Sequence, residues 1–392
     1  MDLDGRNIEQ HERWDAELER WRERFSFLRS GRIHMASCSQ SPVADDVRRA
    51  VGNYMDSLTE KGMDWETWLG EVEAAKAEFA RLINADPEEI AVAASASAAI
   101  ASVAGALDFQ GRRRKVVTSK LDFPTVPYVW HGFEKYGAVL DIVASAEEYE
   151  ARIDDDTVIV SIAHANYETG ELQDVAAIGE LVRAKGALLL VDAYQSVGVE
   201  PIDVQELQID VLVTGASKYL LGVPGIAFLY VRRDLADAWR PAVTGWMGQI
   251  DPFRFPTDGL APAAGSRRFE IGTPPVAAAY AARAGIRIVN TIGIERIARH
   301  GRMLSETAIA LADEYGLELA SPRDPSRKTP LTAIRTPGMA PGDVANALLR
   351  RGIVAAPRER VLRIAPHFFS TPEELRHVFA VTAEVVQASR RL

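Results

Sequence analysis

The chain has 392 residues, of which 47% are hydrophobic and 26% charged, the balance of an ordinary soluble globular protein with room for two domains. Its formal net charge of −10 argues against nucleic acid or an anionic membrane as a partner, because both require a basic surface. A single cysteine, Cys38, excludes an intramolecular disulfide and a CxxC metal site, and we expect no metal.

The N-terminal segment is polar and charged, without the apolar core of a signal peptide, and no run of about 18 apolar residues indicates a membrane span, so we expect a cytoplasmic protein. Apolar side chains then follow at alternating steps of four and three residues: Trp14, Leu18, Trp21, Phe25 and Leu28. This spacing predicts an amphipathic helix within residues 1–30, docked on the body of its own or a neighbouring subunit. A helix that binds another partner is the alternative.

Short apolar runs alternate with helical stretches from about residue 90. The candidate strands are residues 90–94, 115–119, 139–143, 157–163, 187–192, 210–215 and 226–231. Several are continuous aliphatic runs, as expected of strands that are buried on both faces. Strand–helix–strand units in series predict an α/β fold with a mainly parallel sheet between helices.

Proline- and glycine-rich sequence fills residues 241–275, and helical patterns dominate again from residue 276. We therefore predict a large domain over residues 31–275 and a smaller α+β domain over residues 276–392.

Three polar residues follow two of the predicted strands. Asp192 ends the run ALLLVD, and Ser217 and Lys218 close the run DVLVTGASK. Ligands of open parallel sheets bind beyond the carboxyl ends of the strands. A surface salt bridge between Asp192 and Lys218 is one interpretation, and a ligand that both side chains contact is the other.

A bound pyridoxal 5′-phosphate (PLP) would explain both charges. A lysine in a largely apolar pocket has a lowered pKa, so that its neutral amine can attack the aldehyde of PLP. A carboxylate beside the pyridine nitrogen keeps that nitrogen protonated, and the ring can then accept electrons from a bond broken at the substrate's Cα.

Residues 191–204 (VDAYQSVGVEPIDV) and 210–231 (DVLVTGASKYLLGVPGIAFLYV) resemble the class V aminotransferase family, which includes cysteine desulfurases, isopenicillin N epimerases and kynureninases on the aspartate-aminotransferase fold. The resemblance implies that Lys218 carries PLP as a Schiff base and that Asp192 pairs with the pyridine nitrogen. It also implies that Gln195 lies near the cofactor O3′ and that Ser217 binds the phosphate.

Three further segments resemble cofactor-binding stretches of the family. In ASASAAI (residues 94–100), Ala96 and Ser97 would meet the phosphate at a helix N-terminus, although the pattern also suits a simple N-cap. In LDFPT (residues 121–125), Phe123 would stack on the PLP ring, or else be a core residue. In HANYETG (residues 164–170), Asn166 would contact a cofactor oxygen, and we interpret His164 as structural.

Two later segments complete the resemblance. RFEIGT (residues 268–273) resembles the motif that reaches the phosphate of the neighbouring subunit, here through Gly272 and Thr273, which implies a homodimer. LRIAPHFFSTPEEL (residues 362–375) resembles the substrate-carboxylate motif, with Arg363 as the bidentate group. Thr371 begins a capping box for the last helix. The side chain of the substrate would be contacted by residues from regions in which members of the family differ most: Trp246, Tyr128, Arg254 and His367.

The chain departs from two branches of the family. It has no cysteine in the region of the desulfurase nucleophile, since Cys38 lies near the N-terminus, where we expect a buried inert thiol. The Asp-Trp-Arg segment of kynureninases is replaced by Ala356, Pro357 and Arg358.

These observations predict a PLP enzyme that acts on an amino-acid substrate through a Schiff base, with an aminotransferase placed first. A β-eliminating C–S or related lyase is the next alternative, followed by kynureninase-like hydrolysis or epimerisation. A PLP-fold protein without catalysis is disfavoured by the joint presence of Asp192, Lys218 and Arg363.

Overall fold

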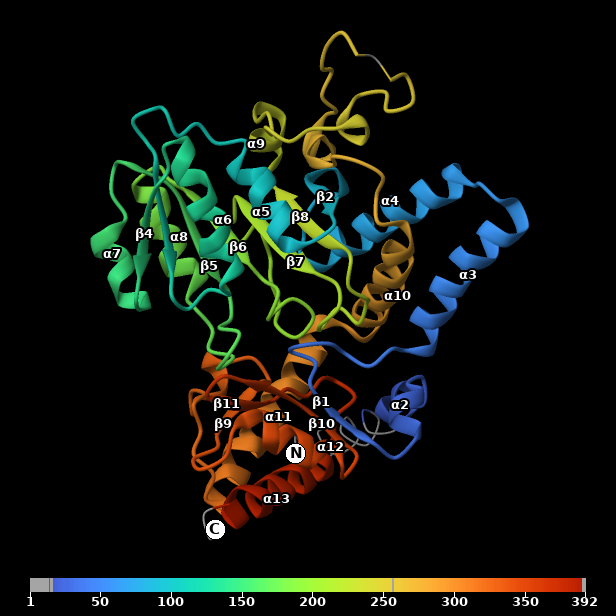
Figure 1. Cartoon of the computed structure of the whole chain (residues 1–392), viewed down its shortest axis with the longest axis vertical. Coiled ribbons are helices and arrows are strands. Elements are labelled where there is room, and N and C mark those ends of the chain that lie inside the picture. The colour runs from blue at the N-terminus through green and yellow to red at the C-terminus, as the bar shows by residue number, and fades with distance from the viewer. Residues whose placement is uncertain (1–13, 15–16, 256, 390–392) are drawn as a thin grey trace, which may run out of the picture.

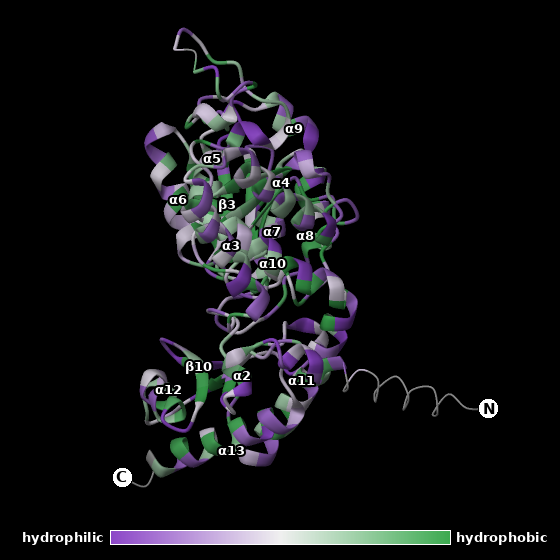
Figure 2. Cartoon of the chain, turned by 90° about the vertical axis from the view of Figure 1, so that its right-hand side faces the viewer, coloured by the Kyte–Doolittle hydropathy of each residue, from purple (hydrophilic) through white to green (hydrophobic). Residues whose placement is uncertain are grey.

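The computed structural model describes residue 14, residues 17–255 and residues 257–389. It consists of a larger part around a seven-stranded sheet and a smaller part around a four-stranded sheet, stacked along the long axis of the molecule (Figures 1 and 2). No helix in these residues is both long enough and apolar enough to span a bilayer.

The larger sheet contains all seven predicted strands, and each begins and ends within one residue of its prediction. They are β2 (Ile90–Ala93), β3 (Lys115–Ser119), β4 (Val139–Val143), β5 (Thr157–Ala163), β6 (Leu188–Asp192), β7 (Val211–Gly215) and β8 (Ala227–Val231). Their order is β2-β8-β7-β6-β5-β3-β4, and only β8 runs antiparallel to its neighbours. The α/β fold with a mainly parallel sheet is confirmed.

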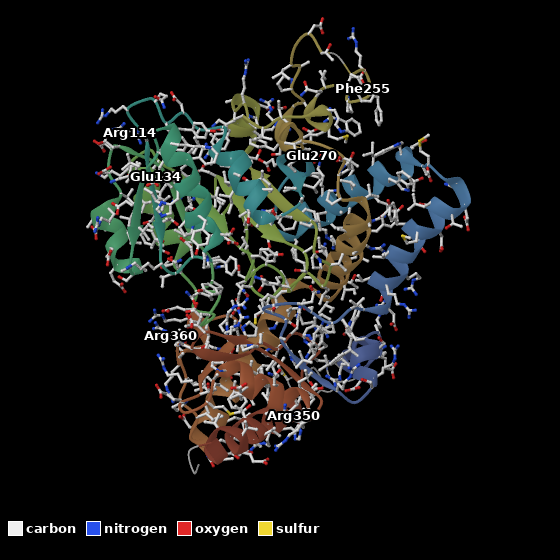
Figure 3. The ribbon with its side chains drawn as sticks, viewed as in Figure 1. Arg114, Glu134, Phe255, Glu270, Arg350 and Arg360 are labelled. Atoms are coloured by element: carbon white, nitrogen blue, oxygen red, sulfur yellow. The ribbon has the colours of Figure 1, made fainter. Side chains whose placement is uncertain are left out.

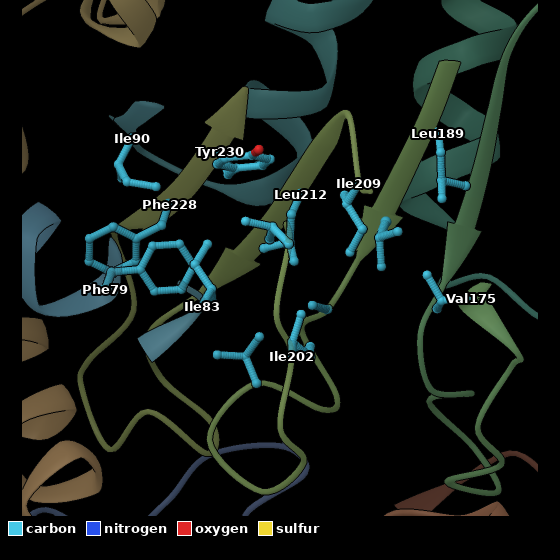
Figure 4. Packing of buried hydrophobic residues seen from close by; sticks show 14 of the residues in the cluster. Phe79, Ile83, Ile90, Val175, Leu189, Ile202, Ile209, Leu212, Phe228 and Tyr230 are labelled. Atoms are coloured by element: carbon cyan, nitrogen blue, oxygen red, sulfur yellow. The ribbon is translucent and has the colours of Figure 1, made fainter. Parts of the chain in front are cut away.

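Helices cover both faces of this sheet. Residues of α4 (Trp65–Leu82), α8 (Val175–Ala184) and α10 (Val276–Ile292) share one core with the strands. There Phe79 stacks on Phe228, with their ring centroids 4.6 Å apart (Figure 4). On the other face lie α5 (Ala96–Ala104), α6 (Thr125–Phe133) and α9 (Arg233–Ala238). Tyr149 of α7 (Tyr149–Arg152) is buried in the same core as α4, α8 and α10, whereas α3 (Asp45–Lys61) packs further out, along α10.

The smaller sheet has the order β1-β10-β11-β9. Its strands are β1 (Ile33–Met35), β9 (Thr332–Arg335), β10 (Ile353–Arg358) and β11 (Val361–Ile364), and its helices are α11 (Ile294–Tyr315), α12 (Pro341–Leu349) and α13 (Pro372–Ser389). The predicted capping box of α13 is confirmed, because Thr371 and Glu374 exchange side-chain to backbone hydrogen bonds.

Packing refines the proposed division into two domains. β1 pairs in parallel with β10, so this piece of the N-terminal segment belongs to the smaller sheet. Helix α10 packs along α3 and α4 and so belongs to the larger part, although the sequence places the boundary at its start. We therefore propose the two predicted domains, with β1 assigned to the smaller domain and α10 to the larger one.

The N-terminal helix is interrupted rather than continuous. Helix is present at residues 17–22, a turn follows, and the four-residue helix α2 (Ser26–Arg29) comes after it. The break places Phe25, which is fully buried, against Phe368 and Phe369 of the smaller part. This tertiary contact overrides the helical periodicity. Residues 1–13 and 15–16 of the prediction lie outside the described residues.

Candidate active site

Several chain segments converge at one edge of the larger sheet. β2, β3, β5, β6 and β7 run in the same direction, so their carboxyl ends meet there, beside the start of β8. A cavity of about 350 Å³ opens at this edge. It is lined by Ser39, Ala94, Ser95, Ala96, Ser97, Phe123, Thr125, Ala163, Ala165, Tyr167, Asp192, Tyr194, Gln195, Ser217, Lys218, Pro224, Gly225, Ile226 and Arg358.

The predicted pair, Asp192 and Lys218, faces this cavity together. Asp192 is the last residue of β6, and Lys218 follows β7, the parallel neighbour of β6. Burial raises the pKa of the Asp192 carboxyl, while a hydrogen bond from the Tyr194 amide and the charge of Lys218 oppose the rise. Burial lowers the pKa of Lys218 to about 8, although Asp192 acts in the opposite direction. A substantial fraction of the Lys218 amine is therefore neutral near physiological pH.

Tyr194 is a lining residue that the sequence analysis did not identify. Its ring centroid lies 4.0 Å from Lys218 Nζ, and its hydroxyl is 3.3 Å from Ser217 Oγ. Gly215 makes this position possible, since a Cβ at residue 215 would overlap the Tyr194 ring. The signal was available in the sequence, because Tyr194 stands between Asp192 and Gln195 in a single motif.

The N-terminus of α5 also points its first turn at the cavity, through Ser95, Ala96 and Ser97. The Ser95 side chain caps the helix by accepting a hydrogen bond from the Ala98 amide, so the predicted N-cap is present. Ser97 Oγ lies 2.7 Å from Thr125 Oγ1. The first amides of a helix have no intrahelical partner and favour an anion. This end of the cavity is thus suited to a phosphate.

Gln195 lies at the cavity with one half of its amide unsatisfied. Its Nε2 donates to the Cys38 carbonyl at 3.1 Å, whereas its buried Oε1 has no hydrogen-bond partner in the described residues. Cys38 itself is fully buried, and burial raises the pKa of its thiol. The thiol thus stays protonated, as expected of an inert cysteine.

The segment after β5 positions other side chains than the one predicted. Asn166 does not line the cavity; its side chain donates to the Leu121 carbonyl and accepts from the amides of Glu168 and Thr169. The turn that it holds carries Tyr167, which does line the cavity, with its ring 5.2 Å from that of Phe123. His164 is hydrogen-bonded to Ser196 and does not line the cavity, in agreement with a structural role.

Two arginines of the smaller part approach the site in different ways. Arg363, on β11, has no solvent exposure and does not line the cavity. It donates to the Tyr167 carbonyl at 2.7 Å and to the Ala356 carbonyl at 3.3 Å, while its Nη2 has no partner. Arg358, at the end of β10, lines the cavity directly. From the sequence, Arg358 was noted only in a segment that departs from the kynureninases and was given no binding role, because the reach of its side chain from the neighbouring strand was not evident.

The remaining predicted residues do not line the cavity of their own chain. Trp246 packs in an aromatic cluster with Trp65, Phe253 and Phe255. Gly272 has open space around its Cα, and Thr273 is exposed. Of the residues suggested for the substrate side chain, His367 is buried against the Tyr219 carbonyl, and Tyr128 and Arg254 are exposed. No group of three metal-ligating side chains was found in the described ranges.

The lowered pKa of Lys218 predicts its chemical reactivity. In the protein without cofactor, labelling of Lys218 by a small electrophile should rise with pH and level off above about 8, whereas an ordinary lysine continues to rise to about 10.4. In Asp192→Asn the plateau should begin at lower pH, because the carboxylate raises the pKa of the amine. Peptide mass spectrometry across a pH series measures both. A rate that keeps rising into the ordinary lysine range would contradict the prediction.

Comparison with known proteins gives one consistent result. Residues 49–385 match the family model described as aminotransferase class-V. An uncharacterised aminotransferase, YcbU, of Bacillus subtilis is 42% identical over 363 residues, which cover 92% of this chain and 95% of that protein. A kynureninase of Deinococcus radiodurans is 30% identical over 322 residues, which cover 80% of this chain and 74% of the kynureninase.

Solved structures agree with the fold. The apo structure of a cysteine desulfurase from Thermococcus onnurineus NA1 superposes with a TM-score of 0.85 at 24% identity, covering 94% of this chain and 98% of that chain. A C-DES mutant with glycine covalently linked to its PLP cofactor gives a TM-score of 0.84 at 18% identity, covering 93% of this chain and 99% of the other.

Proposed function

The chain belongs to the aminotransferase class V family of PLP-dependent enzymes, and on that premise we propose that it transfers the amino group of an amino acid to a keto acid, with Lys218 as the cofactor-bearing residue. The observation that carries the proposal is the convergence of Lys218 and Asp192, from adjacent parallel strands, on one cavity. The specific reaction and the assignment of each residue below belong to this proposal.

The residues of the cavity fit PLP. The α5 N-terminus and the hydroxyls of Thr125 and Ser217 suit the phosphate, and the unpartnered Gln195 Oε1 is a buried polar atom that a ligand hydroxyl would satisfy. Phe123 is 40% exposed at the cavity, so one face of its ring is free to stack on a flat heteroaromatic ring. A volume of about 350 Å³ is within the range of small-molecule sites.

When bound, PLP supplies an electron-accepting ring for the electrons of a bond broken at the substrate's Cα. Asp192 holds a proton at the ring nitrogen. Lys218 Nζ, whose pKa is lowered to about 8, would take the proton from Cα and return it to the cofactor carbon C4′. Arg363 orients the substrate through its α-carboxylate. Its buried Nη2 atom has no partner in the described residues, and a carboxylate would satisfy it.

Amino transfer is favoured over β-elimination by the small number of proton-transfer groups. Transfer needs one base that moves a proton between two carbons, whereas elimination also gains from an acid that protonates the leaving group. Among the described lining residues, Lys218 is the one amine and Asp192 the one carboxyl. Burial raises the pKa values of both lining tyrosines, Tyr167 and Tyr194, so they hold their protons tightly.

Nitrogen-labelled amino acids test the proposal. The holoenzyme is mixed with a panel of labelled donors and keto acids, and the label is followed by mass spectrometry. Transfer of the label to the keto acid, without free ammonia, is the expected result. Ammonia together with a keto acid derived from the donor would indicate a lyase instead, and a racemised donor an epimerase. A purified protein that binds no PLP would end the enzyme hypothesis.

The proposal includes a homodimer. Gly272 and Thr273 lie outside the cavity of their own chain, but both are accessible to a second subunit. Exposed apolar side chains lie on the same segment, at Ile271, and on the protruding loop of the larger part, where Figure 3 labels Phe255. Sedimentation should show a dimer. Mixing Lys218→Ala with Thr273→Trp chains should restore activity, because the hybrid contains one complete site.

A further inference from the structure

One cationic side chain that lines the cavity has no role in the proposed reaction. Its lining contains two cationic side chains, Lys218 and Arg358, and one anionic side chain, Asp192. Arg363 adds a third cation, which is buried beside Tyr167. In the proposed function Lys218 and Asp192 serve the cofactor ring, the α5 N-terminus serves the phosphate, and Arg363 serves the α-carboxylate, so Arg358 is left without an assigned contact.

We propose that Arg358 binds an anionic group on the side chain of the substrate, and that the substrate is therefore an acidic amino acid. This inference rests on the proposed function for the position of the amino acid. It assigns the substrate class that the family membership leaves open.

The surroundings of Arg358 support a ligand rather than a structural role. No carboxylate, carbonyl or hydroxyl of the described residues pairs with its guanidinium, whereas Arg327 and Arg335 each form an ion pair with a glutamate. Arg358 instead faces another cation. Burial and the charge of Arg363 both lower the pKa of Arg358. An anion bound there would relieve this repulsion.

The two arginines also differ in freedom. Arg363 is held by two backbone carbonyls and offers only one unpartnered nitrogen, which suits a fixed contact common to all substrates. Arg358 stands at the end of β10 with its side chain exposed yet lining the cavity. It can present its full planar fork to a carboxylate, which gives the bidentate contact that distinguishes an acid from its amide.

The phosphate of PLP does not require Arg358. The N-terminus of α5 supplies backbone amides and hydroxyls on the larger part, whereas Arg358 enters from the smaller part. Lys218 and Arg358 line the same cavity from the two parts of the molecule. A substrate held at the cofactor therefore lies in the cavity that Arg358 lines.

Binding of unreactive dicarboxylates tests the inference without turnover. Calorimetry with the holoenzyme compares succinate and glutarate with the monocarboxylates butyrate and pentanoate, which match them in chain length. Arg358→Gln is expected to weaken binding of at least one dicarboxylate by about 10- to 100-fold, the usual cost of a lost charge-assisted pair, and to leave the monocarboxylates unchanged. Arg358→Lys should retain part of the affinity. Thermal melting checks that each variant is folded.

Arg360→Gln is the matched control. This substitution makes the same charge change two residues away. Arg360 is exposed and lies outside the cavity, at the edge of the smaller part (Figure 3). It should leave all four affinities unchanged. With labelled donors, the ratio of kcat/KM for glutamate over glutamine, or aspartate over asparagine, should fall in Arg358→Gln by a similar factor.

Two results would overturn the inference: wild-type protein that binds mono- and dicarboxylates equally, or a folded Arg358→Gln variant with unchanged dicarboxylate affinity. Failure of the proposed function is a separate outcome. In that case no donor would pass its nitrogen to a keto acid, while the calorimetric difference between wild type and Arg358→Gln would remain.

Discussion

Replacing Lys218 with alanine is expected to lower the rate of nitrogen transfer by about a hundred- to ten-thousandfold, the usual contribution of a general base. The variant loses the amine that carries the cofactor and also the group that moves the proton. The tyrosines beside it do not substitute, because burial raises the pKa of Tyr194. The near-violet absorbance of the holoenzyme should disappear with the activity. Stopped-flow assays and absorption spectra measure the two effects.

The control for this variant is Lys185→Ala. Lys185 is an exposed lysine that follows α8, with a distant contact of 3.9 Å to Asp155. It should keep the wild-type rate and spectrum. Added methylamine should restore part of the rate in Lys218→Ala, since the amine can enter the space left in the cavity. An alanine variant that retains most of its rate without added amine would refute the role of Lys218.

Replacing Glu270 with glutamine is expected to destabilise the fold, by less than the about 3–5 kcal/mol of a fully broken buried pair, because the buried ammonium of Lys76 keeps only the more exposed Glu73 as its ion-pair partner. Lys76 and Glu270 are each only 3% exposed, and their charged atoms are 3.1 Å apart. Glu270 also accepts a hydrogen bond from the Val92 amide of β2, so it ties residues 268–273 to the larger sheet. Figure 3 shows Glu270 inside the larger part. Urea denaturation measures the loss.

A double variant, Lys76→Met with Glu270→Leu, separates charge from packing. It removes both charges and should recover much of the stability, since a buried ion pair replaced by apolar side chains often costs little. Lys61→Met is the surface control: Lys61 and Asp64 form a 2.6 Å pair, but Lys61 is largely exposed, so little change is expected. Equal stability of wild type and Glu270→Gln would contradict the prediction.

Strand positions could be predicted closely, since each strand of the larger sheet is an apolar run between turn residues. The same runs place Asp192 and Lys218 at adjacent carboxyl ends, so their meeting at one cavity followed from local pattern and sheet geometry. The capping box of α13 depends on residues three apart, and it too could be predicted.

Two of the misses involve contacts between distant segments. The N-terminal helix breaks because Phe25 packs against Phe368 and Phe369, more than 300 residues away. Arg358 reaches the cavity only because β10 pairs with β11 and β1 beside the larger sheet.

The amino-acid sequence by itself determined the strands, the parallel sheet and the two charged residues at its edge, because these depend on local periodicity and on the fixed direction of parallel strands. Only the tertiary structure decided which side chains of the smaller part complete the cavity. Their positions depend on how two separately formed sheets pack together, and that packing balances many contacts between residues far apart in the chain.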